Sequence, residues 1–312
     1  MFLELTHLSK AFGPQRVIDD LSLGVEKGEV LCLLGASGCG KTTTLRMVGG
    51  FLAPDAGRVL IDGQDVTDLS PEVRPTSTVF QSYALFPHLS VRENVAYGLR
   101  FADVSRAEAR ERAQRMIEAV GLSEHADSGV QEISGGQRQR VALARSLVLG
   151  PKVLLLDEPF SNLDANLRVR MREEVRQIQR EFGVTTVFVT HDRAEAMSFG
   201  DRLAIMREGR ILQVATPREA YDRPADEYCA AFLGHVNELE LDGGRVLFRD
   251  EAVRLGAEGG LEGAVLAATY LGGSWRYDLE VAGQRIEATA PQEEAYSEGT
   301  VVPFGIARTI KF

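Results

Sequence analysis

Short apolar runs bounded by Gly, Pro or Asp recur along the first two-thirds of the chain and predict β-strands. These runs are Val30–Leu34, Val59–Asp62, Thr78–Phe80, Val153–Leu156, Thr185–Val189 and Leu203–Met206. The run VLLL at 153–156 is continuously apolar rather than alternating. Such a strand is typical of a parallel sheet that is covered by helices on both faces.

Helical patterns lie between these runs. In residues 106–120 the apolar positions recur at helical spacing, and they are Ala109, Ala113, Met116, Ile117 and Val120. Ser105 with Glu108, and Ser90 with Glu93, match the capping box that opens a helix. Helices that alternate with strands predict an α/β domain.

The pattern changes near residue 236. From there to residue 312, short alternating runs are separated by glycines, which predicts a small all-β unit. We therefore expect one domain over residues 1–235 and a second over residues 236–312.

Composition excludes several classes of protein. The 312 residues include 35 Lys and Arg and 45 Asp and Glu, a net charge of −10, so the chain lacks the overall basic character of a nucleic-acid-binding protein. Cys32, Cys39 and Cys229 form no CxxC pair and predict neither a disulfide framework nor a zinc site. The N-terminus does not resemble a signal peptide, and no apolar stretch reaches the roughly 18 residues needed to cross a bilayer. Any role at a membrane is therefore expected to depend on a partner.

Residues 35–42 read GASGCGKT and match the phosphate-loop pattern GxxxxGK[ST]. A predicted strand precedes the motif and a helical stretch follows it. Glycines let successive backbone N–H groups point at phosphate oxygens, and the helix adds the positive end of its dipole. Lys41 is expected to reach the β- and γ-phosphates of a nucleotide, and the Thr42 hydroxyl to ligate Mg²⁺. The alternative is an ordinary glycine-rich turn.

A second motif, VLLLDEP at 153–159, places two carboxylates at the carboxyl end of a buried strand. Open α/β sheets bind ligands at this edge. Asp157 is the candidate Mg²⁺ ligand, and Glu158 is the candidate general base that accepts a proton from the attacking water. Alone, the Asp157–Glu158 pair is weak evidence for a nucleotide site. Together with the phosphate loop, it predicts nucleotide hydrolysis.

Residues 134–140 read SGGQRQR, 99 residues after Gly35. A capping serine and glycine N–H groups at a helix start form a second anion-binding site. The motif resembles the signature of the ATP-binding cassette (ABC) ATPases. The resemblance implies a P-loop NTPase (RecA-like) core with an inserted helical subdomain at about residues 89–150, and a C-terminal OB-like, TOBE-type domain. It also implies a homodimer in which each signature covers the ATP of the other chain.

The resemblance assigns further residues one by one. Gln81 matches the glutamine that senses Mg²⁺ and water, Asp164 ends the interface loop SNLD, and His191 matches the histidine that contacts the γ-phosphate. Phe12 lies where the family has an aromatic residue that stacks on adenine, with ordinary core as the alternative. The expected catalytic residues are thus Glu158, His191 and Gln81, and the expected Mg²⁺ ligands are Thr42, Gln81 and Asp157. The expected ATP-binding residues are Phe12, Gly35, Ala36, Ser37, Gly38, Cys39, Gly40, Lys41, Thr42, Thr43, Ser134, Gly135, Gly136, Gln137 and Asp164.

The first 235 residues look most like importer ATPases of the maltose, polyamine and ferric-iron group, and in particular like spermidine/putrescine import ATP-binding proteins. This implies a peripheral subunit on the cytoplasmic face of the cell membrane that works with two permeases and, indirectly, with a solute-binding protein. The solute implied is a polyamine, with ferric iron, phosphonate or sugar as alternatives. In this family a permease helix docks beside the glutamine loop, which makes Ser82–His88 the candidate contact, with Tyr83, Leu85 and Phe86 as its apolar groove or, alternatively, as local core.

Four rival classes fit less well. DNA-maintenance ATPases insert a long coiled coil before the signature, and the 99-residue gap here contains no heptads. Translation-factor cassettes carry two phosphate loops in one chain, and exporter halves are fused to membrane spans. A cassette that serves only as a scaffold usually lacks the glutamate or the histidine, and this sequence has both Glu158 and His191.

Overall fold

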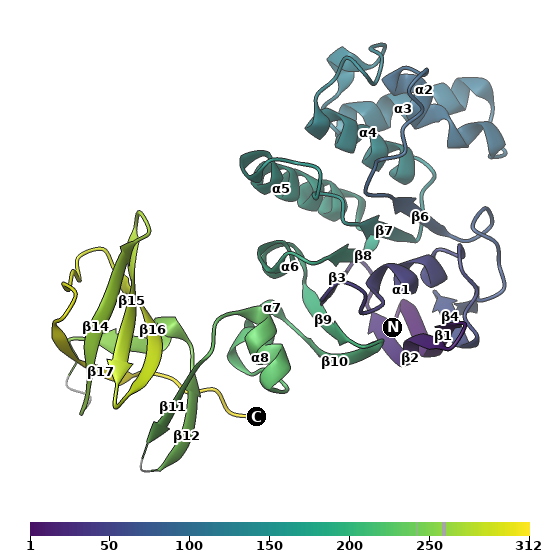
Figure 1. The fold of residues 1–312 in the computed structure, drawn as a ribbon. Helices are drawn as coiled ribbons and strands as arrows, with labels where there is room; N and C mark the ends of the chain where they lie inside the picture. Colours follow the sequence, from purple (N-terminus) through teal and green to yellow (C-terminus); the bar gives the residue numbers. More distant parts are fainter. Residues whose placement is uncertain (242, 258–259) are drawn as a thin grey trace. The chain divides into compact units, whose positions relative to one another are not determined.

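The structure is a computed structural model that describes residues 1–241, 243–257 and 260–312. It divides into two compact units, Met1–Pro217 and Arg218–Phe312, each described by itself (Figure 1). Within the described residues, no helix is both long enough and apolar enough to span a bilayer.

A six-stranded sheet forms the centre of the first unit. Its strand order is β10 (Arg210–Ala215), β9 (Arg202–Arg207), β3 (Val30–Gly35), β8 (Thr185–Thr190), β7 (Val153–Asp157) and β6 (Thr76–Val79). All neighbours are parallel except the edge pair β9–β10. Strands β3, β7 and β8 are almost wholly buried, as their apolar runs predict. Their carboxyl ends therefore share one edge of the sheet.

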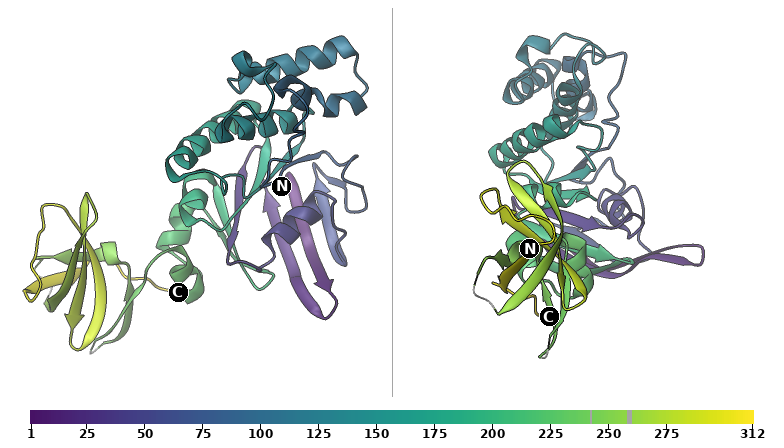
Figure 2. Two further views of the ribbon diagram at one scale, coloured as in Figure 1. Left: turned by 45° about the horizontal axis from the view of Figure 1, so that its top comes forward. Right: turned by 60° about the vertical axis from the view of Figure 1, so that its left-hand side comes forward.

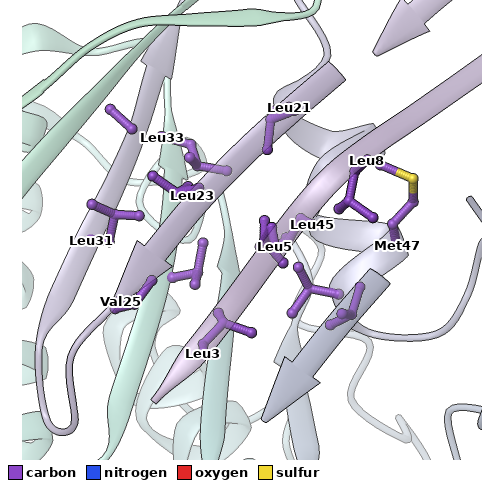
Figure 3. Packing of buried hydrophobic residues seen from close by; sticks show 14 of the residues in the cluster. Leu3, Leu5, Leu8, Leu21, Leu23, Val25, Leu31, Leu33, Leu45 and Met47 are labelled. Carbon is purple, nitrogen blue, oxygen red and sulfur yellow. The ribbon is translucent and has the colours of Figure 1, made fainter. Parts of the chain in front are cut away.

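A smaller antiparallel sheet lies beside the central one. It contains β2 (Gln15–Val25), β1 (Leu3–Phe12), β4 (Ala56–Ile61) and β5 (Gln64–Asp65), in that order. Helix α1 (Lys41–Val48) packs between the two sheets. Figure 3 shows Leu45 and Met47 of α1 among the leucines of β1, β2 and β3, with Met47 beside Leu8. Burial on both sides fixes the position of α1 and of the phosphate loop at its start.

The opposite face of the central sheet is covered by α5 (Ala165–Phe182) and α6 (Arg193–Phe199) (Figures 1 and 2). Helix α5 buries Met171, Val175 and Ile178, which recur at helical spacing. Phe199 of α6 packs against Phe188 of β8, with ring centroids 5.0 Å apart. Helices therefore pack on both faces of the central sheet and fix the edge where its parallel strands end.

The inserted helices form a separate cluster in Figure 1. They are α2 (Val91–Ala96), η1 (Gly98–Phe101), α3 (Arg106–Ala119), η2 (Ser123–His125) and α4 (Gly135–Leu147). Ser90 and Glu93 make both hydrogen bonds of the predicted capping box. Ser105 accepts the predicted bond from the Glu108 amide, and α3 spans the predicted helix to within a residue. Helix α4 begins at Gly135, directly after the predicted capping serine, Ser134.

The second unit begins with the rest of α7 (Pro217–Asp222) and with α8 (Glu227–Leu233), followed by β-structure. A hairpin joins β11 (Asn237–Leu241) to β12 (Gly244–Phe248), and η3 (Asp250–Ala252) follows. An antiparallel sheet has the order β13 (Val253–Leu255), β17 (Val301–Ile306), β14 (Leu261–Tyr270), β15 (Ser274–Val281) and β16 (Gln284–Pro291). Because β13 also contacts β16, this sheet nearly closes into a barrel.

The two units divide earlier in the chain than the predicted boundary between residues 235 and 236. Contacts of Arg249 account for the difference. Its guanidinium donates to the Ala230 carbonyl oxygen of α8 at 2.8 Å and lies over the Tyr221 ring of α7, 4.3 Å from the centroid. Helices α7 and α8 therefore pack with the β-rich part, which apolar periodicity alone does not indicate.

Candidate functional site

The phosphate loop connects β3 to α1 and is shaped by its glycines. Gly38 and Gly40 adopt φ angles of 79° and 107°, which disfavour any side chain. A Cβ atom at Gly40 would lie 2.4 Å from Ile18 Cδ1, so the loop also needs glycine for space. The glycines therefore let the loop curl tightly between β3 and α1.

Lys41 and Thr42 begin α1 at this loop. The Lys41 ammonium is buried and donates to the carbonyl oxygens of Gly35 at 2.7 Å and Ala36 at 3.0 Å. The Thr42 hydroxyl donates to Asp157 Oδ1 at 3.2 Å. These contacts gather a cation, a hydroxyl and a carboxylate at the start of one helix.

The Thr42–Asp157 pair suits Mg²⁺, which usually binds one or two protein ligands together with phosphate oxygens and water. Among the described residues there is no group of three or more His, Cys, Asp or Glu side chains that could hold a metal by themselves. Burial raises the pKa of Asp157 above its ordinary value, and the Thr42 hydrogen bond opposes that rise. A cation beside the carboxylate would relieve this cost of burying its charge.

Glu158 and His191 meet at the same edge, although 33 positions separate them. The parallel register pairs Asp157 with Val189, so β7 and β8 end side by side. His191 Nδ1 lies 3.1 Å from Glu158 Oε1. Glu158 has a φ of 45°, a left-handed conformation that is rare outside glycine and is often found at functional sites.

The other predicted interface residues lie on loops that contact one another. The Asn162 side-chain amide donates to the Gln81 carbonyl oxygen at 2.8 Å, while the Gln81 side chain is exposed. Asp164 caps α5 by accepting from the Leu167 amide at 2.9 Å. Phe12, at the end of β1, is 51% exposed, which removes the core alternative and leaves its ring available for stacking.

A cleft lies over the phosphate loop. Its lining residues are Gln15, Val17, Ser37, Gly38, Gly40, Lys41, Thr42, Thr43 and Glu158. In the described part of the chain, the signature residues 134–137 are not among them. The motif instead opens α4 with a complete capping box, in which Ser134 accepts from the Gln137 amide and Gln137 Oε1 accepts from the Ser134 amide. The predicted ATP-binding residues therefore fall into two groups within one chain.

The predicted permease groove needs one correction. Tyr83 is only 7% exposed, and its hydroxyl donates to the Pro159 carbonyl oxygen at 3.4 Å. Tyr83 is therefore a core residue that offers little surface to a partner. Leu85 and Phe86 are half-buried and keep part of their apolar surface accessible.

Sequence patterns did not point to several residues that shape this region. Gln15 and Val17 of β2 line the cleft because the hairpin β1–β2 passes over the phosphate loop. The Asn162 side chain donates to the Gln81 carbonyl oxygen. Arg145 of α4 donates to the carbonyl oxygens of Tyr83 and Ala84, in the loop that follows Gln81. Gln15 and Val17 belong to no motif, and Arg145 carries no local signal because its partners lie about 60 positions away.

Fold and site together define an ATP-binding cassette ATPase. The sequence profile of the ABC transporter family matches residues 18–161, and that of the TOBE domain matches residues 231–309. The Fe(3+) ions import ATP-binding protein FbpC of Agrobacterium fabrum is 45% identical over 304 residues, covering 88% of this chain and 86% of that protein. The protein of the same name from Mannheimia succiniciproducens is 42% identical and covers 94% and 91%.

The FbpC protein of Escherichia coli K12 is 49% identical over 236 residues, covering 76% of this chain and 68% of its own length. The chain belongs to the ABC transporter family, as one of its ATP-hydrolysing, ATP-binding proteins.

Glu195 supports the end of β8, where Thr190 and His191 lie, and its burial leads to a prediction about pH. It is 3% exposed and accepts from the Thr190 hydroxyl at 2.6 Å. Burial raises the pKa of Glu195 above its ordinary 4.5. A carboxyl group whose pKa is raised by folding favours the folded state when it is protonated, so stability is lost as pH rises from about 4.5 through the raised pKa. We expect the unfolding midpoint of Glu195→Gln, relative to wild type, to be higher at pH 8 than at pH 4.

Thermal unfolding followed by circular dichroism across this range measures the difference. Glu173→Gln is the matched control because Glu173 is an exposed carboxylate on α5. Its difference from wild type should stay flat with pH. An equally flat difference for Glu195→Gln would contradict the prediction.

Proposed function

We propose that this chain is the ATP-hydrolysing subunit of an ABC importer that carries ferric iron. The observation that supports hydrolysis is the contact of Glu158 with His191 beside the phosphate-loop cleft. Iron as solute is supported by relatives that align over most of their length and are named for Fe(3+) import. These names support the ferric-iron alternative better than the polyamine that the sequence resemblance favoured.

Nucleotide binding would use groups already in place. Phe12 would stack on adenine, and the N–H groups of the phosphate loop would surround the phosphates. Lys41 would turn from its carbonyl partners to the β- and γ-phosphates, because a phosphate neutralises its buried charge and a carbonyl does not. Thr42, Asp157 and Gln81 would hold Mg²⁺, which when bound neutralises charge on the phosphates.

Hydrolysis would then depend on Glu158. Its carboxylate accepts the proton of a water molecule in line with the γ-phosphate, which makes the water a better nucleophile. His191 lies beside the carboxylate and donates to the γ-phosphate oxygens as negative charge moves toward the leaving group. Lys41 stabilises the same charge from the opposite side.

The second half of each site would come from a second copy of the chain. Ser134, Gly135, Gly136 and Gln137 form an anion-binding helix start away from the cleft of their own chain. Together with Asp164 they would close over the ATP of the partner. Residues 1–235 would form the ATPase domain and residues 236–312 an accessory domain.

Closing and opening of this homodimer would drive two permeases, fed by a solute-binding protein, from the cytoplasmic face of the cell membrane. Leu85 and Phe86 are the apolar residues that we assign to the permease contact.

Glu158→Gln tests the general base. Glutamine keeps the shape of the side chain but cannot accept a proton, so hydrolysis should fall by about 100-fold or more while ATP still binds. Phosphate release and binding of labelled ATP measure the two effects. Glu208→Gln is the matched control, since Glu208 also has a positive φ and is exposed. Hydrolysis near the wild-type rate in Glu158→Gln would exclude Glu158 as the base.

A mixed dimer tests site sharing. Lys41→Ala damages the phosphate loop and Gly135→Asp damages the signature. Gly135 suits this purpose better than Gly136, whose added Cβ would lie 3.0 Å from Met171 Sδ and disturb the packing of α4. A dimer of one chain of each kind holds one site built from intact halves and one with both halves damaged.

With Glu158→Gln added to both chains to block turnover, the purified mixed dimer should retain about one ATP and neither single-variant dimer should retain any. Equilibrium dialysis of doubly tagged, co-purified dimers gives the stoichiometry. Retention by the Gly135→Asp homodimer at the wild-type level would show that each chain completes its own site.

The solute can be tested in cells. A strain lacking this chain should lose uptake of radioactive iron under iron limitation, and the wild-type chain should restore it while Glu158→Gln should not. Uptake of labelled spermidine should be the same in all three strains. If spermidine uptake followed the chain and iron uptake did not, the polyamine alternative would replace the iron proposal.

A further inference from the structure

The loop that follows Gln81 has an unusual backbone conformation, which is closed at one end by the Tyr83 amide donating to the Phe80 carbonyl oxygen and at the other by Asn94, which binds the Phe86 amide and carbonyl oxygen. Tyr83 and Ala84 are consecutive residues with φ angles of 61° and 46°. This left-handed region is unfavourable for residues that carry a Cβ atom, and especially for a bulky one. Two such residues in a row persist only when surrounding groups hold them.

Arg145 is the group that holds this backbone from the side of α4. Its Nη1 donates to the Ala84 carbonyl oxygen at 2.7 Å, and its Nη2 donates to the Tyr83 carbonyl oxygen at 2.9 Å. The same guanidinium lies 5.6 Å from the centre of the Phe86 ring. A planar fork of N–H groups can bind two neighbouring carbonyls and face an aromatic ring at once, which an ammonium cannot do.

The surroundings of Arg145 leave this as its main task. The contacts of its guanidinium are the two carbonyl oxygens and the Phe86 ring, and burial lowers the pKa of Arg145. The carbonyls that it binds belong to the two left-handed residues.

The other side of the loop is tied to the hydrolytic site. The Asn162 side chain donates to the Gln81 carbonyl oxygen, and the Tyr83 hydroxyl donates to the carbonyl oxygen of Pro159, the residue after Glu158. The loop thus lies between the segment of the general base and the signature helix. Leu85 and Phe86, the residues assigned to the permease, follow directly.

We infer that Arg145 is a positioning residue that holds loop 82–86 in the shape that docks the permease and passes movement of the signature helix to that surface. Arg145 lies on the helix that Ser134 caps, about 16 Å along its axis from the signature. Because a helix of this length moves as a rigid body, engagement of the signature by ATP displaces Arg145 and the carbonyls that it binds. The inference rests on the proposed transport function.

The test compares Arg145→Ala, Arg145→Lys and Arg145→Met with Arg110→Ala, an exposed arginine on α3 that serves as the control. Met keeps the apolar length of the side chain and Lys keeps the charge, but neither can bind both carbonyls. In the purified full-length chain, hydrogen exchange of the amides in loop 82–86 should become faster in all three Arg145 variants and stay unchanged in Arg110→Ala. The KM for ATP and the basal rate should stay close to wild type.

With the two permeases reconstituted in vesicles, the permease-stimulated kcat should fall by about tenfold in the Arg145 variants, a typical size for a coupling between sites. Wild-type exchange in the loop, or wild-type stimulation by the permeases in Arg145→Ala, would overturn the inference. So would loss of basal hydrolysis together with a lower melting temperature in Arg145→Met, which would mark Arg145 as part of the fold alone. Absence of stimulation in the wild-type chain itself would instead count against the transport function, while the exchange measurement still tests the role of Arg145.

Discussion

The close approach of β2 to the phosphate loop is the constraint on which the site depends. Gly40 leaves no space for a Cβ atom beside Ile18, and α1 is buried between two sheets directly after it. These contacts place the phosphate loop against β2 and the start of α1. The buried Lys41 ammonium donates to the carbonyl oxygens of Gly35 and Ala36 and lies 3.8 Å from Cys39 Sγ, so its partners are neutral and leave its charge without an anion. Under the proposed function, a phosphate group would supply that anion.

The chemical groups of the site come together through strand register. Parallel pairing sets Leu34 opposite Thr190 and Asp157 opposite Val189, so three strands end at one level. The phosphate loop, the acidic pair and His191 are the residues that directly follow these ends. A sheet buried on both faces cannot slip its register without exposing or clashing apolar side chains. Core packing far from the nucleotide therefore controls distances at the site.

The sequence was sufficient to predict what local patterns encode. Continuous apolar runs located β3, β7 and β8, the capping pair Ser90–Glu93 located α2, and the motifs located the phosphate loop. The hairpin β1–β2 was not predicted, because its strands are long, bent by register shifts and partly exposed. For Tyr83 the sequence left two interpretations open, a groove for the permease or local core. The structure buries Tyr83 with its hydroxyl bonded to the Pro159 carbonyl oxygen, a partner that the sequence does not reveal.

The roles of Arg145, Asn162 and Arg249 escaped prediction for the same reason. Each binds main-chain carbonyl oxygens of a distant segment, and a carbonyl is present at every position, so the partner leaves no signal in the sequence. A carboxylate partner such as Asp157 can be found by its type, whereas a carbonyl partner can be found only in three dimensions.

The left-handed backbone at Glu158 shows how these contacts serve the chemistry. Its amide donates to the Val189 carbonyl oxygen at 3.0 Å, and its own carbonyl oxygen accepts from the Ser161 hydroxyl at 2.9 Å. Bonds on both sides thus hold Glu158 at a φ that costs about 1 kcal/mol or more. Just after Glu158, the Pro159 carbonyl oxygen accepts from the Tyr83 hydroxyl, and the Asn162 side chain donates to the Gln81 carbonyl oxygen. Under the proposed function, a shift of Glu158 during hydrolysis would stretch bonds that reach loop 82–86, which would link ATP hydrolysis to the surface that we assign to the permease.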